Sequence, residues 1–163
     1  MKLKHAVPIA AVALTAIGAS AAQAQQGTDP TASATFKSKL VRVDRSTAVL
    51  KVTYKCSKGS VLWISAKQLA NGKAKKSLTK EGSSQVAKTW LQSHRNPITC
   101  DGASHTQVFV LDKVEPGSKG RLKAKGKHNA GKAYIQFCVT LTPTDPNGEG
   151  ELTLSKSGFV KVR

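Results

Sequence analysis

Residues 47–56 read Thr-Ala-Val-Leu-Lys-Val-Thr-Tyr-Lys-Cys, and the alternation in this stretch decides the fold class. Successive side chains of a β-strand point to opposite faces, so residues two apart share a face. One face of this segment is apolar and carries Ala48, Leu50, Val52, Tyr54 and Cys56. The other face is mostly polar and carries Thr47, Lys51, Thr53 and Lys55. This pattern is typical of a strand that covers a core on one side and meets water on the other.

The rest of the chain repeats this pattern in short runs separated by Gly, Pro, Asn and Ser, and no long segment after the N-terminal apolar run keeps a helical period. The further strand candidates are residues 61–69, 86–91, 106–112, 120–125, 133–141 and 151–162. Residues 71–85 are polar and Lys-rich, which favours a long loop or an irregular edge. Seven or eight short strands predict an all-β fold, an antiparallel β-sandwich that is immunoglobulin-like in outline, with a small β-barrel as the alternative.

The first 24 residues predict a secretory signal peptide. A positive start and an apolar run precede a small-x-small sequence, namely Lys2, Lys4 and His5, then residues 6–19, then Ala22-Gln23-Ala24. The apolar run is shorter than the roughly 20 residues that a bilayer core requires, which argues against a membrane anchor. We therefore expect a secreted, extracellular protein. Residues 25–31 are expected to be a flexible leader, and residues 32–163 a single β-sandwich domain.

The charge of the chain is strongly unbalanced. The sequence carries 26 Lys and Arg against nine Asp and Glu, a formal net charge of +17. Removal of the predicted signal, which contains Lys2 and Lys4, leaves 24 against nine, or +15. A net charge of magnitude about 2–8 suffices for the solubility of a small domain. The excess therefore favours attraction of anionic polymers, and the predominance of Lys over Arg favours loose attraction over a precise phosphate site. The alternative is that the charge only keeps an exported protein soluble.

Three cysteines in an exported chain predict one disulfide and one leftover thiol. Cys56 lies on the apolar face of its strand, and Cys100 shares a face with Ile98 if that segment is extended. In residues 133–141, Cys138 lies on the face opposite to the apolar set. We therefore expect a Cys56–Cys100 bridge with Cys138 as a half-buried thiol outside it, and Cys56–Cys138 is the main competing pair. A disulfide-linked dimer through Cys138 is the other outcome for a leftover thiol.

Residues 119–127 read Lys-Gly-Arg-Leu-Lys-Ala-Lys-Gly-Lys, so every odd position is basic and every even position is Gly, Leu or Ala. On a strand, alternate residues share a face at a spacing of about 6.6–6.8 Å, close to the phosphate repeat of an extended polyphosphodiester. The candidate polyanion-binding residues are therefore Lys119, Arg121, Lys123, Lys125 and Lys127. The alternatives are an edge strand whose lysines prevent edge-to-edge pairing and a flexible basic loop. A second patch would form if the fold brings alongside Lys73, Lys75, Lys76 and Lys80.

The sequence contains no motif that predicts catalysis or metal binding. Asp101, His105 and His94 are the nearest approach to a hydrolase or metal site, but G-x-S-x-G and H-E-x-x-H are absent from the sequence. No Cys or His pair has zinc-ligand spacing. Asp101-Gly102 is more simply a turn after a disulfide. We therefore expect no enzyme, no metal and no cofactor.

Two short sequences resemble a pattern of small secreted β-sandwich proteins of actinomycetes. Val52-Thr53-Tyr54-Lys55-Cys56 is similar to a strand that ends in Y-x-C, and residues 99–105, Thr-Cys-Asp-Gly-Ala-Ser-His, are similar to a C-D-G-x-x-H turn. The resemblance covers roughly residues 32–141 and implies a β-sandwich with a Cys56–Cys100 bridge. That family has no assigned activity, and this chain departs from it by a third cysteine and many more lysines.

These patterns together predict a secreted, non-catalytic binding protein that associates electrostatically with anionic polymers of the cell envelope or its surroundings. For the same reason, we expect the protein to bind nucleic acid non-specifically. The alternative, from a different class, is a secreted protein-interaction module or enzyme inhibitor. An extracellular hydrolase is a third hypothesis.

Overall fold

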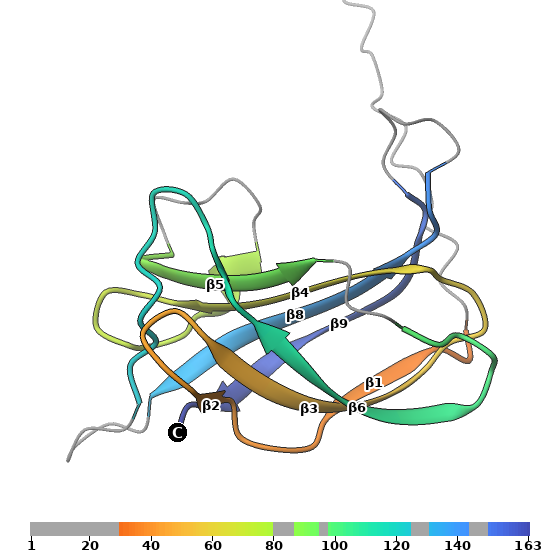
Figure 1. Cartoon of the computed structure of the whole chain (residues 1–163), viewed down its shortest axis with the longest axis horizontal. Coiled ribbons are helices and arrows are strands. Elements are labelled where there is room, and N and C mark those ends of the chain that lie inside the picture. Colours follow the sequence, from red (N-terminus) through yellow and green to blue (C-terminus); the bar gives the residue numbers. More distant parts are fainter. Residues whose placement is uncertain (1–29, 80–86, 95–97, 125–130, 144–149) are drawn as a thin grey trace, which may run out of the picture.

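The computed structural model describes residues 30–79, 87–94, 98–124, 131–143 and 150–163. In this part of the chain, nine strands form two antiparallel sheets (Figure 1). The four-stranded sheet consists of β1 (Ser33–Phe36), β2 (Val41–Arg42), β3 (Ala48–Lys55) and β6 (Ser104–Leu111). The five-stranded sheet consists, in spatial order, of β7 (Lys113–Val114), β5 (Thr89–His94), β4 (Val61–Gln68), β8 (Lys132–Thr140) and β9 (Leu152–Lys161). A short 3-10 helix, η1 (Lys76–Thr79), follows β4.

The core lies between the two sheets, where the apolar faces of their strands meet. Leu50 of β3 and Ile64 of β4 are fully buried in one cluster. Phe109 of β6 and Phe137 of β8 belong to the same cluster, and their ring centroids lie 5.5 Å apart at an interplanar angle of 71°. The edge-to-face packing of these two rings joins β6, which pairs only with β3 in the described sheets, to β8 in the interior of the five-stranded sheet.

The two sheets form an open sandwich. β3 pairs along its whole length with β6, and β8 pairs with both β4 and β9. β1 and β9 are each the last strand of their sheet, and a parallel bridge between Leu40 and Val162 joins the sheets near them. Figure 1 shows β6 passing in front of β8 and β9, so the sheets overlap as two layers. The predicted antiparallel sandwich is confirmed, and the small-barrel alternative is wrong because the sheets do not close.

The predicted disulfide between Cys56 and Cys100 is confirmed. Cys56 follows β3 and Cys100 precedes β6, and their Cα atoms lie 4.7 Å apart. Because β3 and β6 are neighbours in one sheet, the bridge closes the end of this strand pair and does not link the two sheets. Cys138 lies outside the bridge on β8, half-buried, with its Sγ 3.9 Å from Oγ of Ser155. The competing Cys56–Cys138 pair is therefore wrong.

Several predicted boundaries are corrected by the structure. The strand expected at residues 86–91 is β5, which begins only at Thr89, and the expected loop contains η1. The short strands β1, β2 and β7 were not expected, because two to four residues are too few to show an alternating pattern. The predicted signal peptide, residues 1–24, and most of the predicted leader lie outside the described residues. In the described ranges, no helix is long and apolar enough to cross a bilayer.

Candidate polyanion-binding surface

Residues 119–124 run as an extended segment beside the five-stranded sheet. Lys119 forms an isolated parallel bridge with Thr89, and its N–H donates to the carbonyl of Lys88 at 2.8 Å. The hydroxyl of Thr89 donates to the carbonyl of Arg121 at 3.3 Å. These contacts tie the first half of the segment to the start of β5.

The second half of the segment is held by the side chain of Gln68, which is fully buried at the end of β4. Oε1 of Gln68 accepts a hydrogen bond from the N–H of Lys123 at 2.7 Å, and Nε2 donates to the carbonyl of Lys123 at 3.0 Å. Both backbone groups of Lys123 are thus satisfied by a side chain and not by a neighbouring strand. This explains why the strand predicted at residues 120–125 is wrong over the described residues 120–124.

The side chains of the segment nevertheless alternate between surface and interior. Lys119, Arg121 and Lys123 are exposed, whereas Leu122 between them is fully buried in the sandwich core. Burial of Leu122 anchors the segment and leaves its cations in water. Of the predicted binding residues, Lys125 and Lys127 lie outside the described part of the chain.

Cations from other parts of the chain lie beside this segment. Nη1 of Arg42 donates to the carbonyl of Leu122 at 3.1 Å. The backbone carbonyl of Arg45 lies against Gly120, 3.3 Å from the position that a Cβ would take there. The N–H of Arg42 also donates to the carbonyl of Arg163 at 2.9 Å. The C-terminal strand and the turn after β2 therefore meet residues 119–124 at one place.

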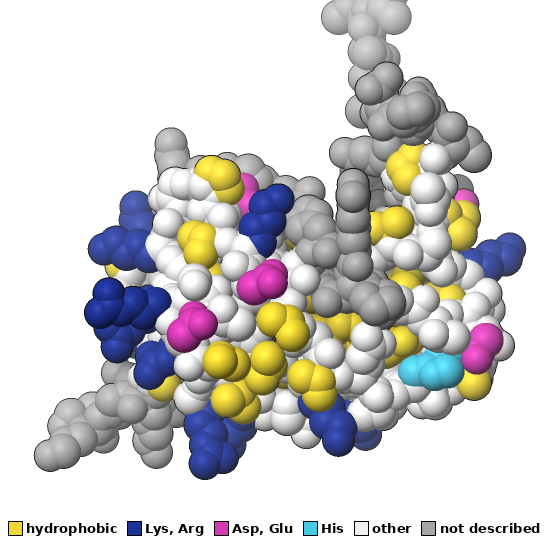
Figure 2. Space-filling view, in the orientation of Figure 1, with side chains coloured by type: hydrophobic (Ala, Val, Ile, Leu, Met, Phe, Trp, Pro, Cys, Tyr) yellow, Lys and Arg dark blue, Asp and Glu magenta, His cyan; other side chains and the backbone are white. Residues whose placement is uncertain are grey.

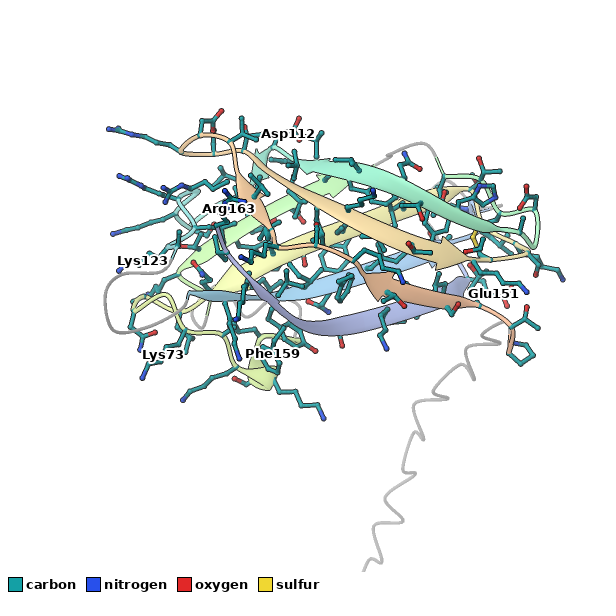
Figure 3. The ribbon with its side chains drawn as sticks, turned by 90° about the horizontal axis from the view of Figure 1, so that it is seen from below. Lys73, Asp112, Lys123, Glu151, Phe159 and Arg163 are labelled. Carbon is teal, nitrogen blue, oxygen red and sulfur yellow. A yellow bond between two sulfur atoms is a disulfide. The ribbon has the colours of Figure 1, made fainter. Side chains whose placement is uncertain are left out.

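The loop after β4 adds a further cation to this place. Nζ of Lys123 donates to the carbonyl of Ala70 at 2.6 Å, and the side chain of Lys123 packs against Gly72. Lys73 is thereby brought next to Lys123, and Figure 3 shows Lys73, Lys123 and Arg163 at the same end of the sandwich, with Glu151 at the other. Of the second predicted patch, only Lys73 joins this surface by these contacts, and Lys80 lies outside the described residues.

We call this surface the cationic end. Its residues are Arg42, Arg45, Lys73, Lys119, Arg121, Lys123 and Arg163. In Figure 2, Lys and Arg side chains gather at the left of the view, at this end of the molecule. Like charges so arranged add their fields at one surface, which is what attraction of a polyanion requires.

Three carboxylates of the described residues lie near the cationic end, and two of them are already engaged by hydrogen bonds. Oδ1 of Asp44 accepts from the N–H groups of Ser46 at 2.7 Å and Thr47 at 2.8 Å, and chiefly the first of these lowers the pKa of Asp44. The carboxylate of Glu115 accepts from the side-chain amide of Gln92. Asp112 is exposed. Among the residues that the structure describes, seven cations thus outnumber three carboxylates at this end.

Asp101 and His105, the nearest approach to a hydrolase or metal site in the sequence, form a pair that holds a turn. Nε2 of His105 lies 2.7 Å from Oδ1 of Asp101, the same oxygen that accepts from the N–H of Ala103 at 2.8 Å. The hydrogen bond with His105 is the main cause that lowers the pKa of Asp101. Gly102, between them, adopts a φ of 82°, as a tight turn requires. Among the described residues, no group of three His, Cys, Asp or Glu could hold a metal ion.

Sequence reasoning missed a buried cation on the outer face of the five-stranded sheet. Lys67 of β4 is fully buried, with its Nζ 3.8 Å from the ring centroid of Trp90 and 5.4 Å from that of Trp63. Its Nζ also donates to Oε1 of Gln136 at 2.7 Å. Two indole faces and an amide oxygen stabilise the ammonium in place of water. The signal in the sequence was the shared face of Trp63 and Lys67, which are four residues apart on one strand.

Comparison of the chain with protein-family models, with curated proteins and with solved structures found no match. The resemblance to secreted actinomycete proteins therefore stays a prediction.

Proposed function

We propose that this protein is an exported, non-catalytic binding protein that associates electrostatically with anionic polymers of the cell envelope or its surroundings, and that the cationic end is its binding surface. The observation that carries the proposal is the convergence of seven cations from four separate parts of the chain. The Cys56–Cys100 bridge supports export, because disulfides persist in oxidising compartments.

The arrangement of the cations supports binding more strongly than their number does. Lys119, Arg121 and Lys123 form no ion pair with any carboxylate of the described residues. Like charges held together repel one another and cost folding free energy, and a bound polyanion relieves this repulsion and releases its own counterions. The exposed lysines are mobile point charges, which suits a polymer without fixed geometry.

The test is retention on a polyphosphate column under rising salt. The variant carries Lys119→Glu, Arg121→Glu and Lys123→Glu together. We expect the variant to elute at clearly lower salt than the wild type. With duplex DNA as a second probe, the slope of log K against log salt should become shallower by about 0.9 for each phosphate that the variant no longer neutralises.

A matched control separates the cationic end from net charge. Lys51, Lys55 and Lys58 lie on or just after β3, away from residues 119–124, and their triple replacement by Glu changes the net charge by the same amount. This control should elute close to the wild type. Equal losses in the two triple variants would show that only total charge matters, and the proposal would then be wrong.

A second candidate function, a protein-interaction module or enzyme inhibitor, is favoured by an apolar patch. The outer face of the four-stranded sheet exposes Val41 (40%), Val43 (62%), Val108 (55%) and Val110 (40%). Figure 2 shows apolar side chains gathered in the middle of this face. A partner held there should stay bound at high salt and be lost when Val108→Lys is combined with Val43→Lys, whereas a polymer at the cationic end should show the opposite behaviour.

A further inference from the structure

A groove of about 640 Å³ lies between β1 and β9, the two edge strands on the same side of the sandwich. Residues 34–39 form one wall, and residues 156–161 form the other. Gly158 faces the groove, and a Cβ built there would lie 3.3 Å from Cε2 of Phe36. The ring of Phe36 therefore packs over Gly158, and a side chain at this position would push the ring away.

The walls of this groove are cationic and partly aromatic. Its charged residues are Lys37, Lys39, Lys156 and Lys161. No carboxylate is among the described residues that line it. Phe159 on the β9 wall is 51% exposed, although its ring also packs edge-to-face on Tyr134. The groove therefore offers positive charge and an apolar surface together, which the cationic end does not.

Both walls also offer unpaired backbone. β1 pairs with β3 and β9 pairs with β8. The outer edge of β9 is occupied at its C-terminal end, where the carbonyl of Lys161 accepts a hydrogen bond from the N–H of Leu40 at 2.9 Å. Among the described residues, no backbone hydrogen bond joins this edge to another segment before Lys161. An edge strand presents N–H and C=O groups that an extended peptide can pair with. The nine residues of β9 before Lys161 span roughly 30 Å at about 3.3 Å each. This length accommodates a peptide of about nine residues.

The charge of the molecule indicates which peptide fits. A second copy of this chain, at a formal net charge of +17, would be repelled by the four lysines. A polysaccharide would meet the lysines but leave the strand edges unpaired. An acidic peptide satisfies both the ammonium groups and the backbone groups. We propose that an extended acidic segment of a partner protein docks along β9 as an added strand. This proposal does not rest on the cationic end.

The test uses a fluorescein-labelled peptide of about nine residues in which Glu and Thr alternate. Fluorescence anisotropy measures its binding to the full chain. Two further peptides carry backbone N-methyl groups, one on the odd residues and one on the even residues. In a strand, these two sets of N–H groups point to opposite edges. We expect one methylated peptide to bind about tenfold more weakly or worse, and the other to bind like the parent.

Variants of the protein test the same site without changing the probe. Lys156→Gln with Lys161→Gln should weaken peptide binding severalfold, whereas Lys55→Gln with Lys58→Gln, which removes the same charge elsewhere, should not. Gly158→Val should displace the ring of Phe36, change the shape of the groove and weaken binding with no change of charge. Circular dichroism checks that each variant folds. If Gly158→Val does not fold, the variant with Lys156→Gln and Lys161→Gln still tests the site.

Two outcomes would overturn the proposal. If both methylated peptides bind like the parent, the attraction is electrostatic without strand pairing. If the Lys55 and Lys58 control loses as much affinity as the groove variant, the site is not the groove. The variant with Lys119→Glu, Arg121→Glu and Lys123→Glu should lose polyphosphate retention and keep peptide binding, so the two proposals can fail separately.

Discussion

The two ends of the sandwich are stabilised by different interactions. At the cationic end, residues 119–124 are held by side-chain hydrogen bonds, above all those of the buried Gln68. At the opposite end of β3, the Cys56–Cys100 bridge and the Asp101–His105 pair hold the turn that leads into β6. One end is closed covalently, and the other is built from interactions that water can replace.

This difference suggests that stability and binding are located in different places. The cations of the cationic end lie on the surface, while the disulfide restrains the chain far from them. Changes at the disulfide end should therefore act on unfolding, and changes of the exposed cations at the other end on binding. The following predictions test this separation, beginning with the largest expected effect.

Removal of the disulfide should have the largest effect. Cys56→Ser with Cys100→Ser opens a loop of sequence separation 44, which should lower the free energy of unfolding by about 4 kcal/mol in the chain-entropy model. Urea denaturation measures this loss. Cys138→Ser, which leaves the bridge intact, is the control. Equal urea midpoints for the double variant and the wild type would contradict the prediction.

Gln68→Leu should cost about 3 kcal/mol, because it leaves buried backbone groups without partners. Nε2 of Gln68 lies within hydrogen-bonding distance of the carbonyls of Gly72, Lys123 and Lys132, at 3.0 to 3.3 Å. The same substitution at Gln107, whose Oε1 accepts one bond of 3.3 Å from Tyr54, should cost less. Polyphosphate retention should fall only in the Gln68 variant, since only that change releases residues 119–124. If polyphosphate retention falls in both variants, the proposed separation of stability and binding is wrong.

Single neutralisations at the rim of the cationic end should act on binding alone. Arg45→Ala and Lys73→Ala should each weaken polyphosphate binding by about twofold, the size of one exposed charge interaction. Neither change should move the thermal midpoint measurably. Lys58→Ala near the disulfide is the matched control and should leave binding unchanged. If Lys58→Ala weakens binding as much as Arg45→Ala, the polyphosphate-binding surface is not confined to the cationic end.

The smallest effect should be a pH dependence at both ends. The pKa values of Asp44 and Asp101 are lowered in the folded protein, in the first case mainly by the N–H of Ser46 and in the second mainly by His105. Each ionised carboxylate therefore stabilises the fold above its unfolded pKa, near the ordinary value of 3.8, and this contribution is lost as the pH falls through the lowered pKa. Thermal midpoints of Asp44→Asn and Asp101→Asn should lie slightly below wild type at neutral pH and approach it in acid. Asp112→Asn is the control, and a gap that widens in acid would contradict the assignment.

The sandwich and its disulfide were predictable because strand faces are a local property. In residues 47–56 every second side chain is apolar, and the same parity placed Cys56 inside and Cys138 on the opposite face. Such alternation needs about five residues to be visible, which is why β1, β2 and β7 were not predicted.

The surface was only partly predictable, because it depends on residues distant in sequence. The alternation of Lys119, Arg121 and Lys123 with buried neighbours followed from the sequence, but the segment is not a strand because Gln68, 55 residues from Lys123, supplies its partner. The approach of Arg42 and Arg163 depends equally on the tertiary fold. The burial of Lys67 was not predictable either, because a lysine on the outer face of a strand is ordinarily exposed to solvent.

The setting of Lys67 has a consequence for spectroscopy. The chain has two tryptophans, Trp63 and Trp90, and both flank this one ammonium group. All indole emission of the protein therefore originates from a single spot on the outer face of the five-stranded sheet, outside the sandwich core. A melting curve followed by tryptophan fluorescence reports on this spot, and one followed by far-ultraviolet ellipticity reports on both sheets. Agreement of the two curves would show that the contacts of Lys67 with Trp63 and Trp90 are lost in the same transition as the two sheets.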